Sequence, residues 1–343
     1  MILVGFNAKH FLPKCLRSLQ KGTYKNFEIL YVDNGSKDGT ATYIKKNHPY
    51  VRLFEKSRNL GFSPAHEGMI EKAKGDAILI LNTDTVLAKN LLEELVKALY
   101  KEKSIGAVQP KILMFPSTDK IDSIGSFFLP SGFLYHVGYE KDANLPQYNK
   151  PMEIFSTKGA VMLIKKAVLE KVSFPASKDH KASIFDLDYF TLFEDTDLSH
   201  RIWLSGYRIL YVPSTYAYHV GGGTVKKMVH SFVIFHGEKN RLATYIKNLS
   251  LSNLLRALPQ MILMSQIEAF AYLLIKGRID IFFAVYRALL WNIAHIGITL
   301  QKRKFIQNVM RSVPDDDFLP KLTKHIRPSY YFYLLFSLKY YKD

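Results

Sequence analysis

Acidic and amide side chains gather at three points of the sequence, each beside a short apolar run. They are Asn7 with Asp33-Asn34, then Asn82-Thr83-Asp84, and then Glu194-Asp195-Thr196-Asp197. Open α/β sheets bind their ligands at the carboxyl ends of the strands. We therefore expect the three clusters to lie at one edge of a sheet.

The first cluster has the residue types of a nucleotide site. A carboxylate such as Asp33 at a strand end can accept hydrogen bonds from a ribose hydroxyl or a base N–H. The stretch 33–39 is also rich in Asn, Asp and Gly, which form turns through local hydrogen bonds. A turn without a ligand is the alternative.

The second cluster has a carboxylate suited to a divalent cation. Asp84 can share Mg²⁺ or Mn²⁺ with the oxygens of a diphosphate, and the cation then stabilises the leaving group. His219 can complete the metal shell as a neutral imidazole. The alternatives are a helix start capped before Leu91 and a structural histidine.

The third cluster offers a general base. A carboxylate can take the proton from an attacking hydroxyl, and Asp195 is the candidate. Arg201 follows Asp197 at the i, i+4 spacing of one helical face. The alternative is an acidic helix start that complements the helix dipole, with Asp197 and Arg201 as a surface pair.

The first 220 residues alternate short apolar runs with helical patterns, which predicts parallel strands joined by crossover helices. Strands are expected at Ile2 to Phe6, Phe27 to Val32, Val51 to Glu55, Ala77 to Leu81, Ile105 to Val108, Gly159 to Ile164 and Tyr207 to Val212. Helices are expected at Phe11 to Gln20, Pro64 to Ala73 after an N-cap at Ser63, Leu91 to Tyr100, Lys166 to Val172 and Asp195 to Leu204.

Residues 116–157 interrupt this rhythm with prolines and aromatic runs, which indicates an insertion with a hairpin around Leu129 to Gly132.

Two long apolar helical patterns follow residue 230, at Leu254 to Ile275 and Ile279 to Leu300, and both carry charged residues. They are marginal as membrane spans. Amphipathic helices lying in a membrane interface suit them better, and a basic helical domain is the other alternative. We therefore divide the chain into 1–230 and 231–343.

The net charge of +17 over 343 residues lies mainly in the C-terminal part. Residues 221–343 hold 18 Lys and Arg against 7 Asp and Glu, a net charge of +11. The basic residues that flank the apolar patterns are Lys276, Arg278, Lys302, Arg303, Lys304 and Arg311. A nucleic acid, an anionic membrane or an acidic substrate would suit this charge. The apolar density of the same region favours the membrane.

Cysteine usage and the first residues indicate a cytoplasmic setting. Cys15 is the one cysteine, so an intramolecular disulfide or a cysteine-based zinc site is excluded. The chain begins without a basic segment and a long apolar segment, so we expect no secretory signal.

In order along the chain, these motifs resemble the family 2 glycosyltransferases of the type A fold, particularly rhamnosyltransferase-like members. The stretches are Asn7 with Cys15 to Leu19, Glu28 to Thr40, Arg58 to Phe62, Gly75 to Thr85, Lys158 to Ala160 and Phe193 to His219. The resemblance implies a Rossmann-like, mostly parallel sheet with helices on both faces, followed by a C-terminal helical region. It also implies an inverting, single-displacement transfer from a UDP- or dTDP-sugar.

The resemblance further implies roles for individual residues. The residues that it implies for the nucleotide-sugar are Asn7, Asp33, Asn34, Asn59, Gly61, Asn82 and Asp84. Asp195 matches the general base with Glu194 beside it, while Gly159, Asp197 and Arg201 fall on the acceptor side. Asp84 and His219 would hold Mn²⁺ or Mg²⁺. Acceptors in such members are commonly lipid-linked saccharides, which implies polysaccharide synthesis at the cytoplasmic face of a membrane, with peripheral or marginally spanning helices.

The sequence departs from the family pattern at two places. Asn82 stands where the metal motif usually has a carboxylate, so we expect the cation to be held loosely. The first strand is also shorter than usual before Asn7, so we expect a start farther upstream or a fragment.

Three other functions compete with this interpretation. An inactive family member that acts as a scaffold in a glycan-assembly complex is the main alternative. A sugar-1-phosphate nucleotidylyltransferase would need a Gly-rich basic loop, which Asn7-Ala8-Lys9-His10 does not provide. A nucleic-acid binder is suggested by the net charge and by the aromatic and basic residues from Tyr330 to Tyr341, but the apolar density of the tail suits a lipid interface better, so we expect no nucleic-acid partner.

Overall fold

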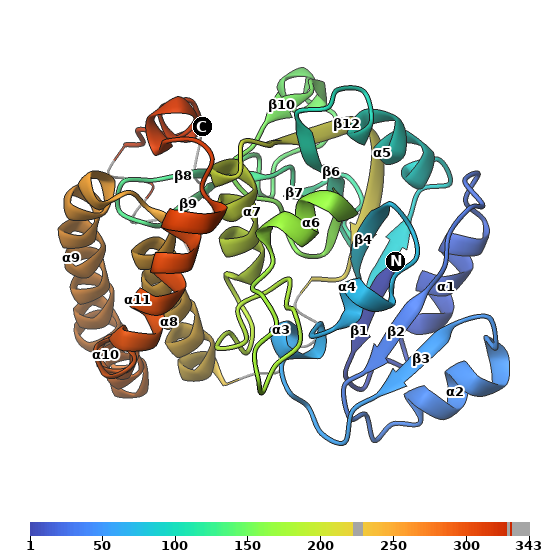
Figure 1. Ribbon diagram of the computed structural model, residues 1–343, viewed down its shortest axis with the longest axis horizontal. Helices are drawn as coiled ribbons and strands as arrows, with labels where there is room; N and C mark the ends of the chain where they lie inside the picture. The colour runs from blue at the N-terminus through green and yellow to red at the C-terminus, as the bar shows by residue number, and fades with distance from the viewer. Residues whose placement is uncertain (222–228, 328–329, 331–343) are drawn as a thin grey trace.

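A computed structural model describes residues 1–221, 229–327 and 330, and Figure 1 shows a central sheet with helices on both sides. The main sheet runs in the order β10 (Met152–Glu153), β12 (Arg208–His219), β6 (Ile105–Met114), β11 (Val161–Lys165), β4 (Ala77–Asn82), β1 (Ile2–Gly5), β2 (Leu30–Asp33) and β3 (Arg52–Glu55). Two short strands join it at the side, β5 (Thr85–Leu87) on β12 and β7 (Ile121–Ser123) on β6.

The sheet is mixed. Strands β4, β1, β2 and β3 are parallel neighbours, and β12 is parallel to β6. Strand β11 is antiparallel to both β4 and β6, so it separates the two parallel groups. The expected α/β fold is confirmed, and its parallel character belongs to these two groups.

Side chains alternate between two hydrophobic cores along the central strands. Ile78 and Ile80 of β4 face one core, whereas Leu79 and Leu81 face the other. Such alternation follows from the two-residue repeat of a strand. Because both faces are covered, β4 is a continuous apolar run of the kind that parallel strands need.

Helices cover both faces of the sheet. The first core is closed by α4 (Met69–Lys72), α6 (Lys166–Val172), α7 (Glu194–Leu204) and α8 (His230–Asn248). The second is closed by α1 (Leu12–Gln20), α2 (Thr40–Asn47) and α5 (Leu91–Leu99). The remaining helical segments are α3 (Phe62–Ala65), η1 (Pro146–Asn149), α9 (Leu251–Lys276), α10 (Ile279–Ala294), α11 (Ile296–Phe305), η3 (Ile306–Met310), η4 (Asp315–Asp317) and α12 (Leu319–Leu322).

The helix predicted from Pro64 to Ala73 is wrong as a single element. It is divided into α3 and α4 by Gly68, which has a φ of +72° and precedes the second piece. A glycine with this backbone conformation ends a helical run. Gly61, not Ser63, is the residue before α3.

The insertion contains the predicted hairpin. Strands β8 (Ser126–Phe128) and β9 (Leu134–His136) pair antiparallel around a turn that contains Gly132 at a φ of +77°. Met261 of α9 packs against that glycine, so a side chain there would collide with α9. The hairpin therefore packs directly on the C-terminal helices.

The C-terminal helices share a core with the sheet. Leu242, Tyr245 and Met261 are buried in the same hydrophobic cluster as Ile2 and Ile80. Helices α8 to α11 stand together at the end of the molecule opposite α1 and α2 (Figure 1). The two regions distinguished in the sequence are thus packed together through one apolar cluster.

Part of the basic charge expected to face a membrane is used inside the protein. Lys302 pairs with Asp186 and Asp188, Arg303 donates to the carbonyl oxygens of Ile246 and Leu249, and Arg311 pairs with Asp315. Lys276 and Lys304 are exposed. The expectation that all six basic residues back the apolar helices is therefore wrong for these three.

Helix α9 is the single helix in the described part of the chain that is long and apolar enough to cross a membrane. Helices α10 and α11 with η3 meet the same criterion as a pair, bent by 63°. Large apolar side chains are exposed along this region, among them Leu263, Leu274, Ile275, Phe283, Leu290 and Ile293.

Candidate active site

A cavity of about 610 Å³ lies at the carboxyl ends of β1, β2 and β4. Its volume is within the range of sites for small ligands. The predicted residues that line it are Asn7, Asn34, Asn59, Gly61, Asn82, Asp84, Gly159, Glu194, Asp195 and His219. We call it the first cavity.

One wall of the first cavity is held by paired asparagines. The Asn34 side chain donates to Asn59 Oδ1 at 2.9 Å and to the Gly61 carbonyl at 3.0 Å, and its own Oδ1 accepts from the Leu60 N–H at 3.0 Å. Gly61 has a φ of +91° and lies against Phe190, so a Cβ would not fit. Asn34 and Asn59 thus fix the loop and leave little hydrogen-bonding capacity for a ligand.

Asp33 lies beside this wall but does not line the cavity. Its side chain is 4% exposed, and its Oδ1 is buried with no hydrogen-bond partner among the described residues. Burial raises the pKa of this carboxyl, while hydrogen bonds from Ser36 oppose the shift.

Asp84 and His219 meet at the opposite wall. Strand β12 pairs with β5 so that His219 lies opposite Thr85, the residue after Asp84. His219 Nε2 is 3.3 Å from Asp84 Oδ1, and its Nδ1 is 2.8 Å from Asp122 Oδ2. The register of one strand pair therefore joins two residues that are far apart in the sequence.

Asp122 and Lys158 are functional candidates that sequence analysis missed. Lys158 Nζ donates to Asp122 Oδ1 at 2.7 Å. Burial raises the pKa of Asp122, but hydrogen bonds from His219 and Lys158 outweigh it and lower the pKa to about 2. Asp122 lies in the irregular insertion, where no motif marks it. Lys158 belongs to the stretch from Lys158 to Ala160 that resembles the family, where it directly precedes Gly159.

These residues fit a divalent cation that brings other ligands with it. A carboxylate and an imidazole are available, and a metal-binding histidine commonly has its second nitrogen fixed by a carboxylate, as Asp122 does here. The described residues contain no group of three or more His, Cys, Asp or Glu that could hold a metal alone. Phosphate oxygens would have to complete the coordination.

Asp195 is held rigidly at the start of α7. Its Oδ2 accepts from the Gly159 N–H at 2.8 Å and its Oδ1 from the Thr196 N–H at 2.7 Å. Leu192 and Phe193, directly before α7, have φ values of +73° and +70°. This left-handed conformation is rare for residues other than glycine and is found at functional sites.

Burial shifts the pKa values of both carboxyls at the start of α7. It raises the pKa of Asp195, and the N–H groups of Gly159 and Thr196 oppose that shift. Burial, together with the charge of Asp195, raises the pKa of Glu194 to about 8. Because the charge of Asp195 raises the pKa of Glu194, the pair favours a state with a single negative charge.

A second cavity, of about 880 Å³, begins where the first one ends. The residues that line both are Lys158, Leu192, Glu194 and Asp195. The second cavity extends between the β8–β9 hairpin and the helices α8 and α9. Asp195 thus lies at the junction of two cavities that can each hold a ligand.

Residues 1–169 match the family model described as glycosyl transferase family 2. This part of the chain is a family 2 glycosyltransferase domain. The protein is thus an enzyme of the glycosyltransferase class, and the resemblance found in the sequence is confirmed.

Among proteins of known function, the glycosyltransferase is similar to the N-acetylglucosaminyl-diphospho-decaprenol L-rhamnosyltransferase of Mycobacterium tuberculosis. The two are 25% identical over 239 residues, which cover 64% of this chain and 75% of the relative.

Solved structures share the fold of the glycosyltransferase. GalNAc-T7, solved with UDP, GalNAc and Mn²⁺, has a TM-score of 0.57 and 18% identity, and the match covers 85% of this chain but 56% of that one. Residues 1–349 of TarS from S. aureus, solved with UDP-GlcNAc, have a TM-score of 0.53 and 15% identity, with 89% of each chain covered. The chain therefore spans little more than half of the first structure and most of the second.

Asp197 and Arg201 lie elsewhere than expected. Both side chains are fully buried, the Arg201 Nε is 2.9 Å from Asp197 Oδ2, and neither residue lines either cavity. Asp197 and Arg201 are therefore not a surface ion pair, and they do not line a cavity on the acceptor side as expected. Asp197 Oδ1 is instead 3.2 Å from Lys247 Nζ and 3.1 Å from Asn248 Nδ2, both on α8.

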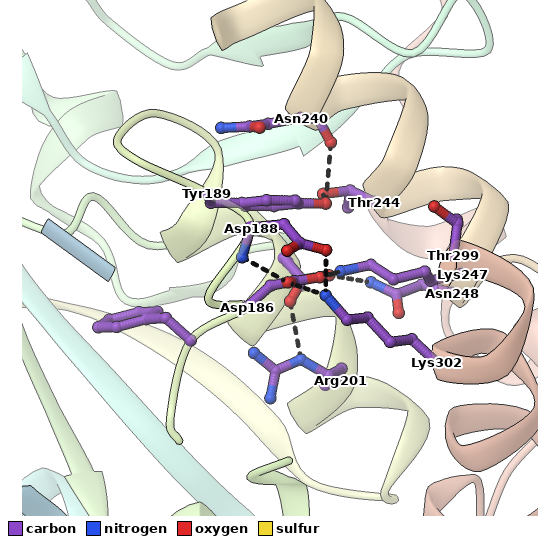
Figure 2. Close-up of polar contacts among 12 residues, drawn as sticks. Asp186, Asp188, Tyr189, Arg201, Asn240, Thr244, Lys247, Asn248, Thr299 and Lys302 are labelled. Carbon is purple, nitrogen blue, oxygen red and sulfur yellow. Dashed lines mark hydrogen bonds and ion pairs between the residues drawn. The ribbon is translucent and has the colours of Figure 1, made fainter. Parts of the chain in front are cut away.

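The same buried cluster holds the loop before Asp195. Asp186 pairs with Lys247 of α8 and with Lys302 of α11 (Figure 2). Burial raises the pKa of Asp186, yet the charges of Lys247 and Lys302 hold it well below its usual range. Lys302 also pairs with Asp188 at 2.5 Å. In the glycosyltransferase, the C-terminal helices therefore position the segment 186–197 through ion pairs.

We expect Glu194→Gln to change the pH dependence of stability. A carboxyl whose pKa rises on folding binds more protons in the native state, so it costs stability as pH rises from about 4.5 to about 8. Urea unfolding of the wild type and the variant should give a growing advantage to the variant between pH 5 and pH 8. The matched control is the exposed Glu170→Gln. Parallel pH curves for wild type and Glu194→Gln would contradict this prediction.

We expect Lys247→Met to destabilise the protein strongly. The substitution leaves Asp186 and Asp197 buried without one of their cations, and breaking a buried ion pair on one side costs about 3 to 5 kcal/mol. Chemical denaturation measures the loss. Lys304→Met, at an exposed position of α11, should change the free energy of unfolding by less than about 0.5 kcal/mol. A loss below about 1 kcal/mol for Lys247→Met would show that the cluster contributes little.

Proposed function

We propose that the enzyme transfers a sugar from a UDP- or dTDP-sugar to a saccharide acceptor by single displacement with inversion, with Asp195 as the general base. This proposal rests on the position of Asp195, whose buried and oriented carboxyl group lies at the junction of two cavities. A displacement needs the acceptor hydroxyl close to the anomeric carbon of the donor and within reach of the base. The donor would lie in the first cavity and the acceptor in the second.

On the donor side, Asp84 and His219 are the proposed ligands of Mn²⁺ or Mg²⁺, with Asp122 and Lys158 holding the imidazole in place. When bound, such a cation would neutralise the charge that develops on the leaving diphosphate. Asn82 lies beside Asp84 in the cavity wall and adds a neutral oxygen. The nucleotide would lie along Asn7, Asn34, Asn59 and Gly61, with Asp33 behind this wall and Gly159 facing the sugar.

On the acceptor side, Asp195 would receive the proton of the attacking hydroxyl. Its Oδ1 accepts from the Thr196 N–H and from the Thr196 hydroxyl, whereas its Oδ2 accepts from the Gly159 N–H, which leaves a lone pair on Oδ2 for that proton. The raised pKa improves its match to a base that works near neutral pH. Glu194, neutral beside it, can donate a hydrogen bond without adding a second charge.

We infer further that the acceptor is lipid-linked and that the enzyme lies on the cytoplasmic face of a membrane in polysaccharide synthesis. The Mycobacterium tuberculosis relative is named for a decaprenol-linked substrate. Exposed apolar side chains on α9 and α10 support a peripheral attachment, with the exposed Lys276 and Lys304 near anionic headgroups. The face of α9 that carries Ser265 and Glu268 is buried against the protein, which favours lying on the membrane over crossing it.

Nucleotide binding and sugar transfer test the proposed function. UDP or dTDP with Mn²⁺ should raise the thermal midpoint of the wild type, because a ligand that binds only the native state stabilises it. Asp84→Ala should reduce the metal-dependent part of that rise. Asp195→Asn should retain the rise but lower transfer by at least about a hundredfold.

The controls separate the enzyme from its main alternative. GDP serves as the competing nucleotide, and Asn90→Asp, outside both cavities, as the control variant. Turnover by Asp195→Asn equal to the wild type would exclude Asp195 as the base. A folded wild type with no response to any nucleotide would favour the scaffold.

Membrane attachment predicts binding to vesicles that contain phosphatidylglycerol. Leu274 and Ile275 are 76% and 67% exposed, and replacing both with Ser should weaken binding by about tenfold, because their burial in the interface is lost. Sedimentation with the vesicles measures this. Tyr50→Ser, at a 49% exposed position far from α9, is the control. Equal sedimentation of the wild type and the double variant would contradict attachment through this face.

A further inference from the structure

The second cavity has a polar cluster in its far wall, where α8 meets α9. Glu238 and Arg241 of α8 and Glu268 of α9 line the cavity there. Arg241 Nη2 donates to Glu238 Oε2 at 2.6 Å, and Ser265 Oγ donates to the same oxygen at 2.6 Å. These four residues, the α8–α9 cluster, are each less than a tenth exposed.

The α8–α9 cluster has unused hydrogen-bonding capacity. Glu268 Oε2 is buried with no hydrogen-bond partner among the described residues, and so is the Nε of Arg241. Glu194 Oε2, in the wall shared with the first cavity, is also buried without a hydrogen-bond partner among the described residues. Buried polar atoms are nearly always paired, and each exception calls for an explanation such as an absent ligand. One donor, the Arg241 Nε, and two carboxyl oxygens, on Glu268 and Glu194, thus belong to residues that line one cavity.

The electrostatics of the α8–α9 cluster suit a neutral ligand. Glu238 and Arg241 cancel each other's charge. Burial, and then the charge of Glu238, raise the pKa of Glu268 to about 8, so this carboxyl is mostly protonated at neutral pH. A protonated carboxyl both donates and accepts hydrogen bonds, which matches the hydroxyl groups of a sugar.

The remaining walls include several apolar side chains. The Arg241 guanidinium stacks 4.0 Å from the centre of the Phe133 ring, and Leu134, Val233 and Ile234 continue the wall. A pyranose ring has one apolar C–H face and a rim of hydroxyl groups. Apolar walls with a few placed polar groups are typical of such binding sites.

We propose that the second cavity binds the saccharide of the acceptor, with Glu268, Glu238 and Arg241 recognising its hydroxyl groups away from the one that reacts. This inference rests on the proposed function, since it assigns the acceptor to the cavity on the far side of Asp195. It makes the α8–α9 cluster a determinant of acceptor specificity. The proposed occupant is uncharged, so the specificity would concern the sugar rather than a phosphate group.

The test uses the full chain and three defined probes. Methyl α-L-rhamnoside, methyl β-D-galactoside and methyl N-acetyl-β-D-glucosaminide are compared by saturation-transfer NMR with UDP and Mn²⁺ present. At least one should bind the wild type. Glu268→Leu should weaken that binding by about tenfold, because the hydrogen bond is lost from a buried site. Glu268→Gln, which keeps a donor and an acceptor, should bind within about threefold of wild type.

Two controls keep the result interpretable. Gln260→Leu makes the same kind of change at an exposed position of α9 and should leave sugar binding unaltered. The UDP-induced rise in thermal midpoint reports folding and the first cavity independently. If Glu268→Leu does not fold, Phe133→Ala takes its place. It removes part of the apolar wall and should weaken sugar binding to a similar extent.

The outcomes separate this proposal from the proposed function. Failure of the wild type to bind either UDP or dTDP would overturn the proposed function itself. Normal UDP binding with no binding of any of the three sugars would overturn the saccharide assignment of the second cavity. Equal sugar binding by wild type and Glu268→Leu would show that the α8–α9 cluster has a structural role only.

Discussion

The structure depends on the compensation of two buried carboxylates, Asp186 and Asp197. A carboxylate removed from water needs charge and hydrogen bonds close by, or it will take up a proton or destabilise the fold. Here Lys247 forms ion pairs with both carboxylates. Arg201 forms a second ion pair with Asp197, and Lys302 forms a second one with Asp186. The cations come from α7, α8 and α11, so these helices can pack only in the arrangement that brings them together.

This compensation explains how a strained backbone persists beside Asp195. Leu192 and Phe193 have left-handed conformations immediately before Glu194, and such residues persist only where the surroundings over-determine them. Asp186 and Asp188 are fixed on one side of this turn, and Asp197 on the other. Asp195 is held between these anchors, and its carboxylate is aligned by the Gly159 N–H from the end of the sheet.

The central sheet and most cavity residues could be predicted, because apolar runs that end in Asn or Asp mark strand ends in parallel sheets. Asp84 was found in this way, whereas Asp195 was found as part of an acidic cluster at a predicted helix start and by the family resemblance. Their surroundings were not all predictable. The apolar run ending at Val212 gave no sign that β12 continues past Pro213 to His219, since its register with β6 shifts at that point. That extension brings His219 to Asp84.

The buried network was the largest error, for a physical reason. Asp197 and Arg201 have the spacing of an exposed helical pair, and their sequence says nothing of what covers them. Lys247 and Lys302 are 61 and 116 residues from Asp186, so no local pattern connects them. Similarly, Gly68 interrupts the predicted helix from Pro64 to Ala73 through a backbone conformation that a helical periodicity does not reveal.

The shared apolar cluster and the buried ion pairs also constrain how this enzyme can diverge. If its helical tail were exchanged for that of another glycosyltransferase, Asp186 and Asp197 would lose Lys247 and Lys302 at once, and Met261 would leave Gly132 without its neighbour. The tail and the glycosyltransferase domain must therefore be inherited together, and a change in the exposed apolar half of these helices must preserve their inward-facing half.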